Sequence, residues 1–338
     1  MIVSTAPGRC GVLGNPTDMY GGSVISCSTR ERARCEIREA DALIVEAEGD
    51  EVERQTITTE ADLAPRGDRL DLAKAVLKGL NVRPGDSAHA FHLTTSTEIP
   101  MQAGLAGSTA LVAAVFGAVA KHLAQTLPPH ETAEAIRGIE YEIMGVVCGF
   151  QDQYMAVFGG LNYLDFRDKG SHLPPNDQPL ATVEPLAARV GAGPLPFLLA
   201  HTGVKHHSGS VHKSVRERWL EGDAAVRDGY ERIQSLARWG KAALLAGDWE
   251  RLADAMNENQ QIQHDLGASG RACDDLIAVA RANGAIAGKL AGAGHGGTIL
   301  ALTFDPERTT AALKAAGAGR ILVPAPASDG LTVTETAE

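Results

Sequence analysis

The chain has 338 residues, long enough for two domains, and its content of 44% hydrophobic and 22% charged residues is that of a globular protein. A formal net charge of −11 argues against binding of nucleic acid through its phosphates, although it allows a local basic pocket. Met1–Leu13 lacks the apolar core of a secretory signal, and no apolar run is long enough to span a bilayer. We therefore expect a cytoplasmic protein with no membrane or nucleic-acid partner. The five scattered cysteines predict neither a disulfide framework nor a zinc site.

A turn-rich segment follows the first predicted strand. The strand-like run Ile2–Ala6 breaks at Pro7, and residues 11–22 are rich in Gly, Asn, Pro and Asp. Residues 7–22 carry Arg9 and Asp18, a cation and a carboxylate that could bind a ligand. The alternative is a surface turn in which Arg9 is solvated and Asp18 hydrogen-bonds its own backbone. Three β-like runs within residues 23–53 then predict an antiparallel meander.

The most informative stretch is a glycine-rich loop at residues 98–109, between a predicted strand and a predicted helix that starts near Ser108. Gly104 and Gly107 would let the backbone turn and approach a ligand, and the helix would aim unpaired N–H groups at an anion. The hydroxyls of Ser108 and Thr109 could cap the helix, bind phosphate or face a metal. The alternative is a tight turn with a capping serine. No lysine follows Gly107, so this is not the Gly-x-x-x-x-Gly-Lys-Ser/Thr loop.

Two carboxylates accompany the next helices. Glu142 lies in a predicted helix over residues 131–147, and Asp152 lies at the start of the following one. Each also has a purely structural reading, Glu142 as a solvated helix charge and Asp152 as an N-cap. The Pro-, Gly- and Asp-rich stretch 169–196 predicts the boundary between an N-terminal domain, 1–175, and a C-terminal domain, 190–338.

A basic cluster and a second glycine-rich loop mark the C-terminal half. The cluster could bind an anion or could be a solvated helix start; it comprises Lys205, His206, His207, His212, Lys213 and Arg216. The loop 289–297 matches Gly-x-Gly-x-x-Gly at Gly292, Gly294 and Gly297. A strand follows where the dinucleotide fingerprint needs a helix, so we expect the loop to pass close to a substrate or another loop instead.

Together these segments resemble the GHMP kinases, the superfamily of galactokinase, homoserine kinase, mevalonate kinase and phosphomevalonate kinase. Residues 6–18 look like the first motif, 100–109 like the Pro-x-x-x-Gly-Leu-x-x-Ser-Ser phosphate loop, and 289–297 like the third motif. The resemblance implies an α+β, two-domain GHMP kinase fold. Its N-terminal domain would be ribosomal-protein-S5-domain-2-like and its C-terminal domain a ferredoxin-like α/β domain. Within the superfamily, the likeness is closest to the glucuronokinases.

The resemblance also implies the chemistry, an ATP- and Mg²⁺-dependent transfer of phosphate to a sugar hydroxyl. Asp152 would accept the proton of that hydroxyl, and Arg9 would stabilise charge on the transferring phosphoryl group. Ser108 and Glu142 would hold Mg²⁺. The nucleotide phosphates would lie against two loops, represented by Gly104, Leu105, Ala106, Gly107, Ser108, Thr109, Gly292, Gly294 and Gly296. The sugar would contact residues of the first motif and of the basic cluster, namely Asn15, Asp18, Tyr20, Lys205, His206 and Arg216.

The acceptor is open at this point. Galactokinases have Glu-His where this chain has Asn15-Pro16, and a missing carboxylate favours an anionic sugar, such as glucuronate phosphorylated on its anomeric hydroxyl. The basic residues at 205–207 resemble kinases of heptose phosphates, and a neutral, galactose- or fucose-like sugar is a further alternative. Two other classes are a non-catalytic sugar sensor and a decarboxylase of a phosphorylated mevalonate-like acid. The resemblance is compatible with a monomer or a homodimer.

Overall fold

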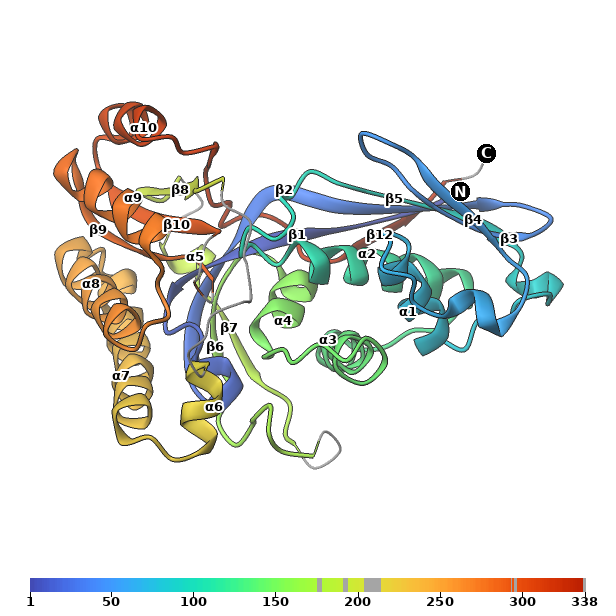
Figure 1. Cartoon of the computed structure of the whole chain (residues 1–338), viewed down its shortest axis with the longest axis horizontal. Coiled ribbons are helices and arrows are strands. Elements are labelled where there is room, and N and C mark those ends of the chain that lie inside the picture. Colours follow the sequence, from blue (N-terminus) through green and yellow to red (C-terminus); the bar gives the residue numbers. More distant parts are fainter. Residues whose placement is uncertain (175–177, 191–193, 204–213, 293, 295–296, 337–338) are drawn as a thin grey trace.

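The computed structural model describes residues 1–174, 178–190, 194–203, 214–292, 294 and 297–336. Two sheets, each covered by helices, form the two halves of the molecule (Figure 1). This is the two-domain α+β architecture that we expected. In the described part of the chain, no helix combines the length and apolarity needed to cross a membrane.

The first sheet has eight strands and is built around the long antiparallel pair β1 (Ile2–Leu13) and β2 (Ser23–Glu39). Its other strands are β3 (Leu43–Ala47), β4 (Glu53–Ile57), β5 (Phe91–Thr97), β6 (Leu161–Asp165), β7 (Thr182–Pro185) and β12 (Thr332–Glu335). The order is β12-β1-β2-β5-β3-β4, with β6 paired to β2 and β7.

The predicted meander over residues 23–53 is wrong, because β5 lies between β2 and β3 and pairs with β3 in parallel. Successive strands are neighbours in a sheet only about two-thirds of the time, and the β-like runs carried no signal for the strand inserted between them.

Helices cover one face of this sheet (Figure 1): α1 (Asp71–Gly79), α2 (Gly107–His122), α3 (Pro129–Gly138) and α4 (Gln151–Phe158). Helix α2 is apolar on nearly every side and lies in the core, against β1 and β2. Helix α3 continues into a wider π-helical turn, Ile139–Ile143, so the helix predicted to run to residue 147 ends earlier. Three short 3-10 segments complete this half: η1 (Thr17–Tyr20), η2 (Glu60–Leu63) and η3 (Ser87–His89).

The second sheet is antiparallel, in the order β11-β8-β10-β9. Its strands are β8 (Phe197–His201), β9 (Ala285–Leu290), β10 (Thr298–Thr303) and β11 (Arg320–Leu322). The helices of this half are α5 (Ala187–Val190), α6 (Val215–Leu220), α7 (Ala224–Ala246), α8 (Trp249–Asp265), α9 (Arg271–Ala282) and α10 (Pro306–Ala315). Helix α8 packs on β9 and also contacts β1, which brings the two halves together along its length.

The end of the chain returns to the first sheet, which corrects the expected C-terminal domain of 190–338. Strand β12 pairs antiparallel with β1, and the amino group of Met1 donates to the carbonyl of Thr336. The two termini therefore lie side by side (Figure 1). Without β12, the outer edge of β1 would expose unpaired N–H and C=O groups, a liability that strand pairing removes.

Candidate active site

Three segments that are far apart in the sequence meet between the two halves. The N–H of Arg9 donates to the carbonyl of Leu105 at 3.0 Å, and the N–H of Gly11 donates to the carbonyl of Ala291 at 2.8 Å. Strand β1 thus holds the glycine-rich loop before α2 on one side and the loop after β9 on the other. The resemblance to the GHMP kinases implied that the first and third motifs lie beside this loop, and in the structure the three segments are in contact.

The two glycine-rich loops touch each other directly. A Cβ at Gly292 would lie 2.7 Å from the carbonyl oxygen of Gly104, and a Cβ at Gly297 would lie 2.7 Å from that of Ala103. Neither approach is possible with a side chain, so glycine is required at both positions. The third motif therefore supports the loop that precedes α2, which is what we expected of a glycine loop between two strands.

That loop presents the start of α2 to solvent. Gly104 has φ of 73° and Ala106 has φ of 57°, and these left-handed residues turn the chain into the helix. The side chain of Leu105 is buried and anchors the loop, whereas Ser108 in the first helical turn is exposed. A loop anchored by the buried Leu105, ending in the exposed N-terminus of a sixteen-residue helix, suits the phosphates of a nucleotide.

Arg9 and Asp152 form an ion pair at this junction. Arg9 donates to Asp152 Oδ1 from Nε at 2.8 Å and from Nη2 at 2.6 Å, and Nη1 donates to the carbonyl of Gly104 at 2.6 Å. One guanidinium thereby joins strand β1, helix α4 and the phosphate loop. The sequence predicted both residues as catalytic, and the structure brings them together.

A buried glutamate lies between helices α2 and α4, and it is Glu140 rather than Glu142, the residue that we expected to bind the metal. Thr109 Oγ1 donates to Glu140 Oε1 at 2.7 Å, and the side-chain amide of Gln153 donates to Oε2. Burial raises the pKa of Glu140 to about 7, although both hydrogen bonds act in the opposite direction. Glu142 instead lies on the exposed side of the π-helical turn. The helical period contained a signal, since Glu140 follows Ala133 and Ile136 on the buried face.

Asp18 fixes the start of helix α4. Its Oδ2 accepts hydrogen bonds from the N–H groups of Phe150 at 2.9 Å and Gln151 at 3.0 Å, so it caps the helix from a distant segment. Burial raises the pKa of Asp18 to about 6, against the effect of these two bonds. One carboxylate oxygen is thus committed to placing Asp152, which occupies the first turn of α4.

Asn15, which we expected to bind the substrate, is instead bonded within the protein. Its side chain is buried, with Nδ2 donating to the carbonyl of Gly292 at 2.8 Å and Oδ1 accepting from Lys289 Nζ at 2.7 Å. Both ends of the amide are therefore used within the protein.

An aromatic cluster lies beside Asp18. The ring of Tyr20 lies 4.5 Å from that of Trp219 and 5.2 Å from that of Tyr230, measured between centroids. Burial raises the pKa of Tyr20 to about 12, while the nearby charge of Arg216 acts to lower it. The Nε of Arg216 is buried and has no hydrogen-bond partner among the described residues. A buried guanidinium nitrogen without such a partner suits an anionic ligand.

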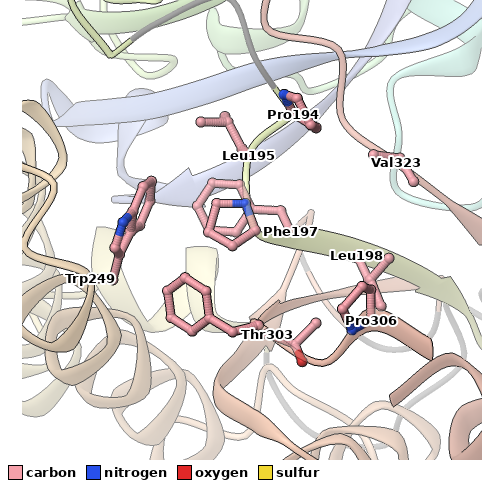
Figure 2. Close-up of a pocket in the computed structure, with 10 residues that line it drawn as sticks. Pro194, Leu195, Phe197, Leu198, Trp249, Thr303, Pro306 and Val323 are labelled. Atoms are coloured by element: carbon pink, nitrogen blue, oxygen red, sulfur yellow. The ribbon is translucent and has the colours of Figure 1, made fainter. Parts of the chain in front are cut away.

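Three of the predicted site residues, Lys205, His206 and Gly296, lie outside the described residues. Gly294 is described, and its φ of 100° and close approach to the carbonyl of Ala268 both require glycine. An apolar hollow of about 560 Å³ lies elsewhere, between the start of β8 and the end of β10, and shares no residue with this site (Figure 2). Its walls include Leu195, Phe197 and Trp249.

Comparison with known proteins places this arrangement in a family. The model of the GHMP kinase N-terminal domain matches residues 71–160, and that of the GHMP kinase C-terminal domain matches residues 241–319. A probable glucuronokinase 2 of Arabidopsis thaliana is 30% identical over 88% of this chain and 83% of its own length. A mevalonate kinase of Pyrococcus abyssi is 26% identical over 100% of this chain and 99% of its own length.

The fold is also similar to that of a solved sugar kinase. The structure of a Lactococcus lactis galactokinase complexed with galactose superposes with a TM-score of 0.74 at 18% identity, over 98% of this chain and 95% of the other. The chain belongs to the GHMP kinase family. It is a phosphotransferase whose acceptor is an alcohol group.

Proposed function

We propose that the chain is an ATP- and Mg²⁺-dependent sugar kinase whose acceptor carries an anionic group, with the anomeric hydroxyl of a uronic acid such as glucuronate as the first candidate. The observation that carries the catalytic part is the Arg9–Asp152 pair beside the phosphate loop. Because Arg9 occupies only Oδ1, the second oxygen of Asp152 accepts no hydrogen bond from the described residues. That oxygen is available to a hydroxyl that loses its proton.

The donor would bind at the start of α2. Its phosphates would accept hydrogen bonds from the first helical turn and from Ser108, and Arg9 would lie beside the transferring group. The helix supplies a positive dipole end where a lysine-containing loop would supply a charge. The third motif would fix the loop from behind through the contact of Gly292 with Gly104.

The residues also fit a divalent cation. Glu140 is a buried carboxylate that forms no ion pair with a described residue, and Thr109 and Gln153 orient its two oxygens. Among the described residues, no group of three acidic, histidine or cysteine side chains could hold a metal alone. Mg²⁺ would therefore need nucleotide oxygens in addition to Glu140 and Ser108. When bound, it would neutralise negative charge on the phosphates.

Transfer would then depend on position and charge. Asp18, by capping α4, holds Asp152 at a fixed place in the first turn of that helix. Asp152 would orient the acceptor hydroxyl toward the terminal phosphate and take its proton. Arg9 would stabilise the negative charge that remains on the phosphoryl oxygens. The ordering of these groups before the reaction lowers the entropic part of the barrier.

The anionic acceptor is supported by Arg216. Its guanidinium lies near Tyr20, in the segment that also carries Asp18, and its Nε has no hydrogen-bond partner among the described residues. The names of the two sequence relatives point the same way, because glucuronate and mevalonate both carry a carboxylate. A phosphate group would satisfy Arg216 equally well, so a heptose phosphate is the second candidate.

A panel of acceptors tests the proposal. ADP release would be measured with Mg-ATP and glucuronate, galacturonate, galactose, fucose, a heptose 7-phosphate or mevalonate. We expect turnover with glucuronate, and a rise in its KM of on the order of 10- to 100-fold in Arg216→Met. Arg227→Met is the matched control, because Arg227 lies over the ring of Trp219, which packs against Tyr20.

The other outcomes are equally informative. Turnover of galactose alone would overturn the anionic acceptor and leave the kinase. Turnover of mevalonate alone would overturn the sugar. Sugar binding without turnover would favour a sensor, and release of phosphate from a phosphorylated mevalonate-like acid would favour a decarboxylase.

A further inference from the structure

Lys289, at the end of strand β9, is one of the most buried charged residues of the protein. Its side chain is 1% exposed, and Nζ lies within hydrogen-bond distance of three oxygens. These are Asn15 Oδ1 at 2.7 Å, the carbonyl of Gly11 at 3.2 Å and the carbonyl of Leu290 at 2.5 Å. No carboxylate forms an ion pair with Lys289 in the part of the chain that the structure describes. The amine is therefore held by neutral oxygens of both halves of the molecule.

Burial of an amine among neutral oxygens costs desolvation free energy, so the contacts of Lys289 call for an explanation. Burial lowers the pKa of Lys289 to about 7, and the charge of Arg9 acts in the same direction. A methionine or leucine of similar volume would avoid this cost of desolvation. Neither, however, could donate hydrogen bonds to Asn15 and Gly11 together.

Asn15 connects Lys289 to the phosphate loop. Its Nδ2 donates to the carbonyl of Gly292, and Gly292 lies directly against Gly104 of the phosphate loop. Three residues after Asn15, Asp18 caps the helix that carries Asp152. A continuous set of contacts therefore runs from the phosphate loop through Gly292 and Asn15 to the acceptor side.

Helix α8 supports this set of contacts with three buried amide side chains. Asn259 accepts from the N–H of Gly14 at 3.0 Å, and Gln263 donates to the carbonyl of Asn15 at 3.2 Å. Gln260 accepts from the N–H of Leu290 at 2.9 Å. The turn at residues 14–15 and the end of β9 are thus fixed to one rigid helix, with Lys289 between them.

We propose that Lys289 is a positioning residue that couples the phosphate loop to residues 11–22, which we call the acceptor segment. The proposal rests on the proposed function in one respect, that a nucleotide binds at the phosphate loop. A nucleotide bound against Gly104 would restrict the motion of Gly292. Asn15 would extend this restriction to the acceptor segment, but only while Lys289 donates to its side-chain oxygen. Neither Lys289 nor Asn15 need touch a substrate.

Amide hydrogen exchange with a non-hydrolysable ATP analogue and Mg²⁺ tests this without any acceptor. In the wild type, we expect the analogue to slow exchange over residues 100–112, where it binds, and also over 11–22. In Lys289→Met, the slowing over 100–112 should remain at saturating analogue, while the slowing over 11–22 is lost. Lys241→Met is the control, because Lys241 pairs with Glu184 near the surface and should behave like the wild type.

A second variant keeps the test meaningful if Lys289→Met does not fold. Asn15→Asp retains an acceptor for Lys289 but removes the donor to Gly292, so it should also lose the slowing over residues 11–22. A merely structural Lys289 would speed exchange over 11–22 equally with and without the analogue, leaving the difference unchanged, and this result would overturn the proposal. No slowing over 100–112 in the wild type would overturn nucleotide binding at this loop, and the coupling with it.

Discussion

Arg9 and Asp152 are joined through a single carboxylate oxygen. Two nitrogens of Arg9 contact Oδ1 of Asp152, at 2.8 and 2.6 Å, while the third guanidinium nitrogen contacts Gly104. This asymmetry allows one cation to hold the carboxylate in place and to stay beside the phosphate loop, while the other carboxylate oxygen remains available to the acceptor.

The geometry of Arg9 should matter as much as its charge. Lysine keeps the charge but cannot reach Asp152 and Gly104 at once, because it lacks the planar fork of a guanidinium. We expect Arg9→Lys to lower kcat by on the order of 100-fold with a smaller change in the KM for ATP. Steady-state kinetics would measure this, with Arg34→Lys as the control, since Arg34 is exposed and pairs with Glu36. A kcat near that of the wild type would exclude Arg9 from the reaction.

Glu140 and Glu142 offer a matched pair for the metal site. Glu140 is buried against Thr109, and Glu142 is exposed two residues later. We expect Glu140→Gln to weaken activation by Mg²⁺ on the order of tenfold or more, because a charged oxygen ligand is replaced by a neutral amide. Glu142→Gln should leave the Mg²⁺ dependence unchanged. The reverse pattern in a Mg²⁺ titration would restore the assignment suggested by the sequence.

The contact between the two glycine loops predicts a difference between two glycines. Gly292→Ala would bring a methyl group 2.7 Å from the carbonyl oxygen of Gly104, so we expect a loss of about 1–3 kcal/mol in the free energy of unfolding and a higher KM for ATP. Gly138→Ala, in a helix with open space around the new methyl group, should gain about 0.5–1 kcal/mol. Denaturant unfolding of both variants would measure these changes, and equal effects would contradict the close contact between the two loops.

Asp18 should make stability depend on pH. Its pKa is raised to about 6 by burial, whereas the unfolded chain has a value of about 3.9. The folded state therefore binds this proton more tightly, and the stabilisation present below pH 4 is lost as the pH rises through 6. Relative to Asp18→Asn, the wild type should lose up to about 3 kcal/mol of unfolding free energy between about pH 4 and pH 7. Denaturant unfolding across this pH range would measure the loss, and profiles of the same shape for the two proteins would show that Asp18 does not titrate in this way.

The sequence predicted those parts of the site that depend on local pattern. Glycines between a strand and an apolar helix predicted the loop before α2, and the resemblance to the family implied that Arg9 and Gly292 lie beside it. Asp152 was assigned from the resemblance to the family, because its position at a helix start is equally typical of an N-cap. The local pattern alone located the loop, and the resemblance supplied the roles of the residues around it.

The errors have a common physical origin in side-chain direction and burial. Glu140 and Glu142 differ by two residues, which places them on different sides of a helical turn, and only one side faces Thr109. Asn15 was expected to meet substrate because it belongs to the first motif of the resemblance, but its amide is bound by Lys289 and Gly292 from the other half of the chain. Lysine within the apolar run before the third motif was a signal of a buried amine, and it gave no indication of its partners.

The role of Asp152 in phosphate transfer to a sugar is tested most directly by ADP release with Mg-ATP and glucuronate in the wild type and in Asp152→Asn. We expect acceptor-dependent turnover that falls by on the order of 100- to 10,000-fold in the variant, with both proteins equally folded. Asp165→Asn, which changes a carboxylate paired only with Arg167, should turn over like the wild type. Undiminished turnover in Asp152→Asn would contradict the role of Asp152, and no turnover with any sugar acceptor would contradict the assignment as a sugar kinase.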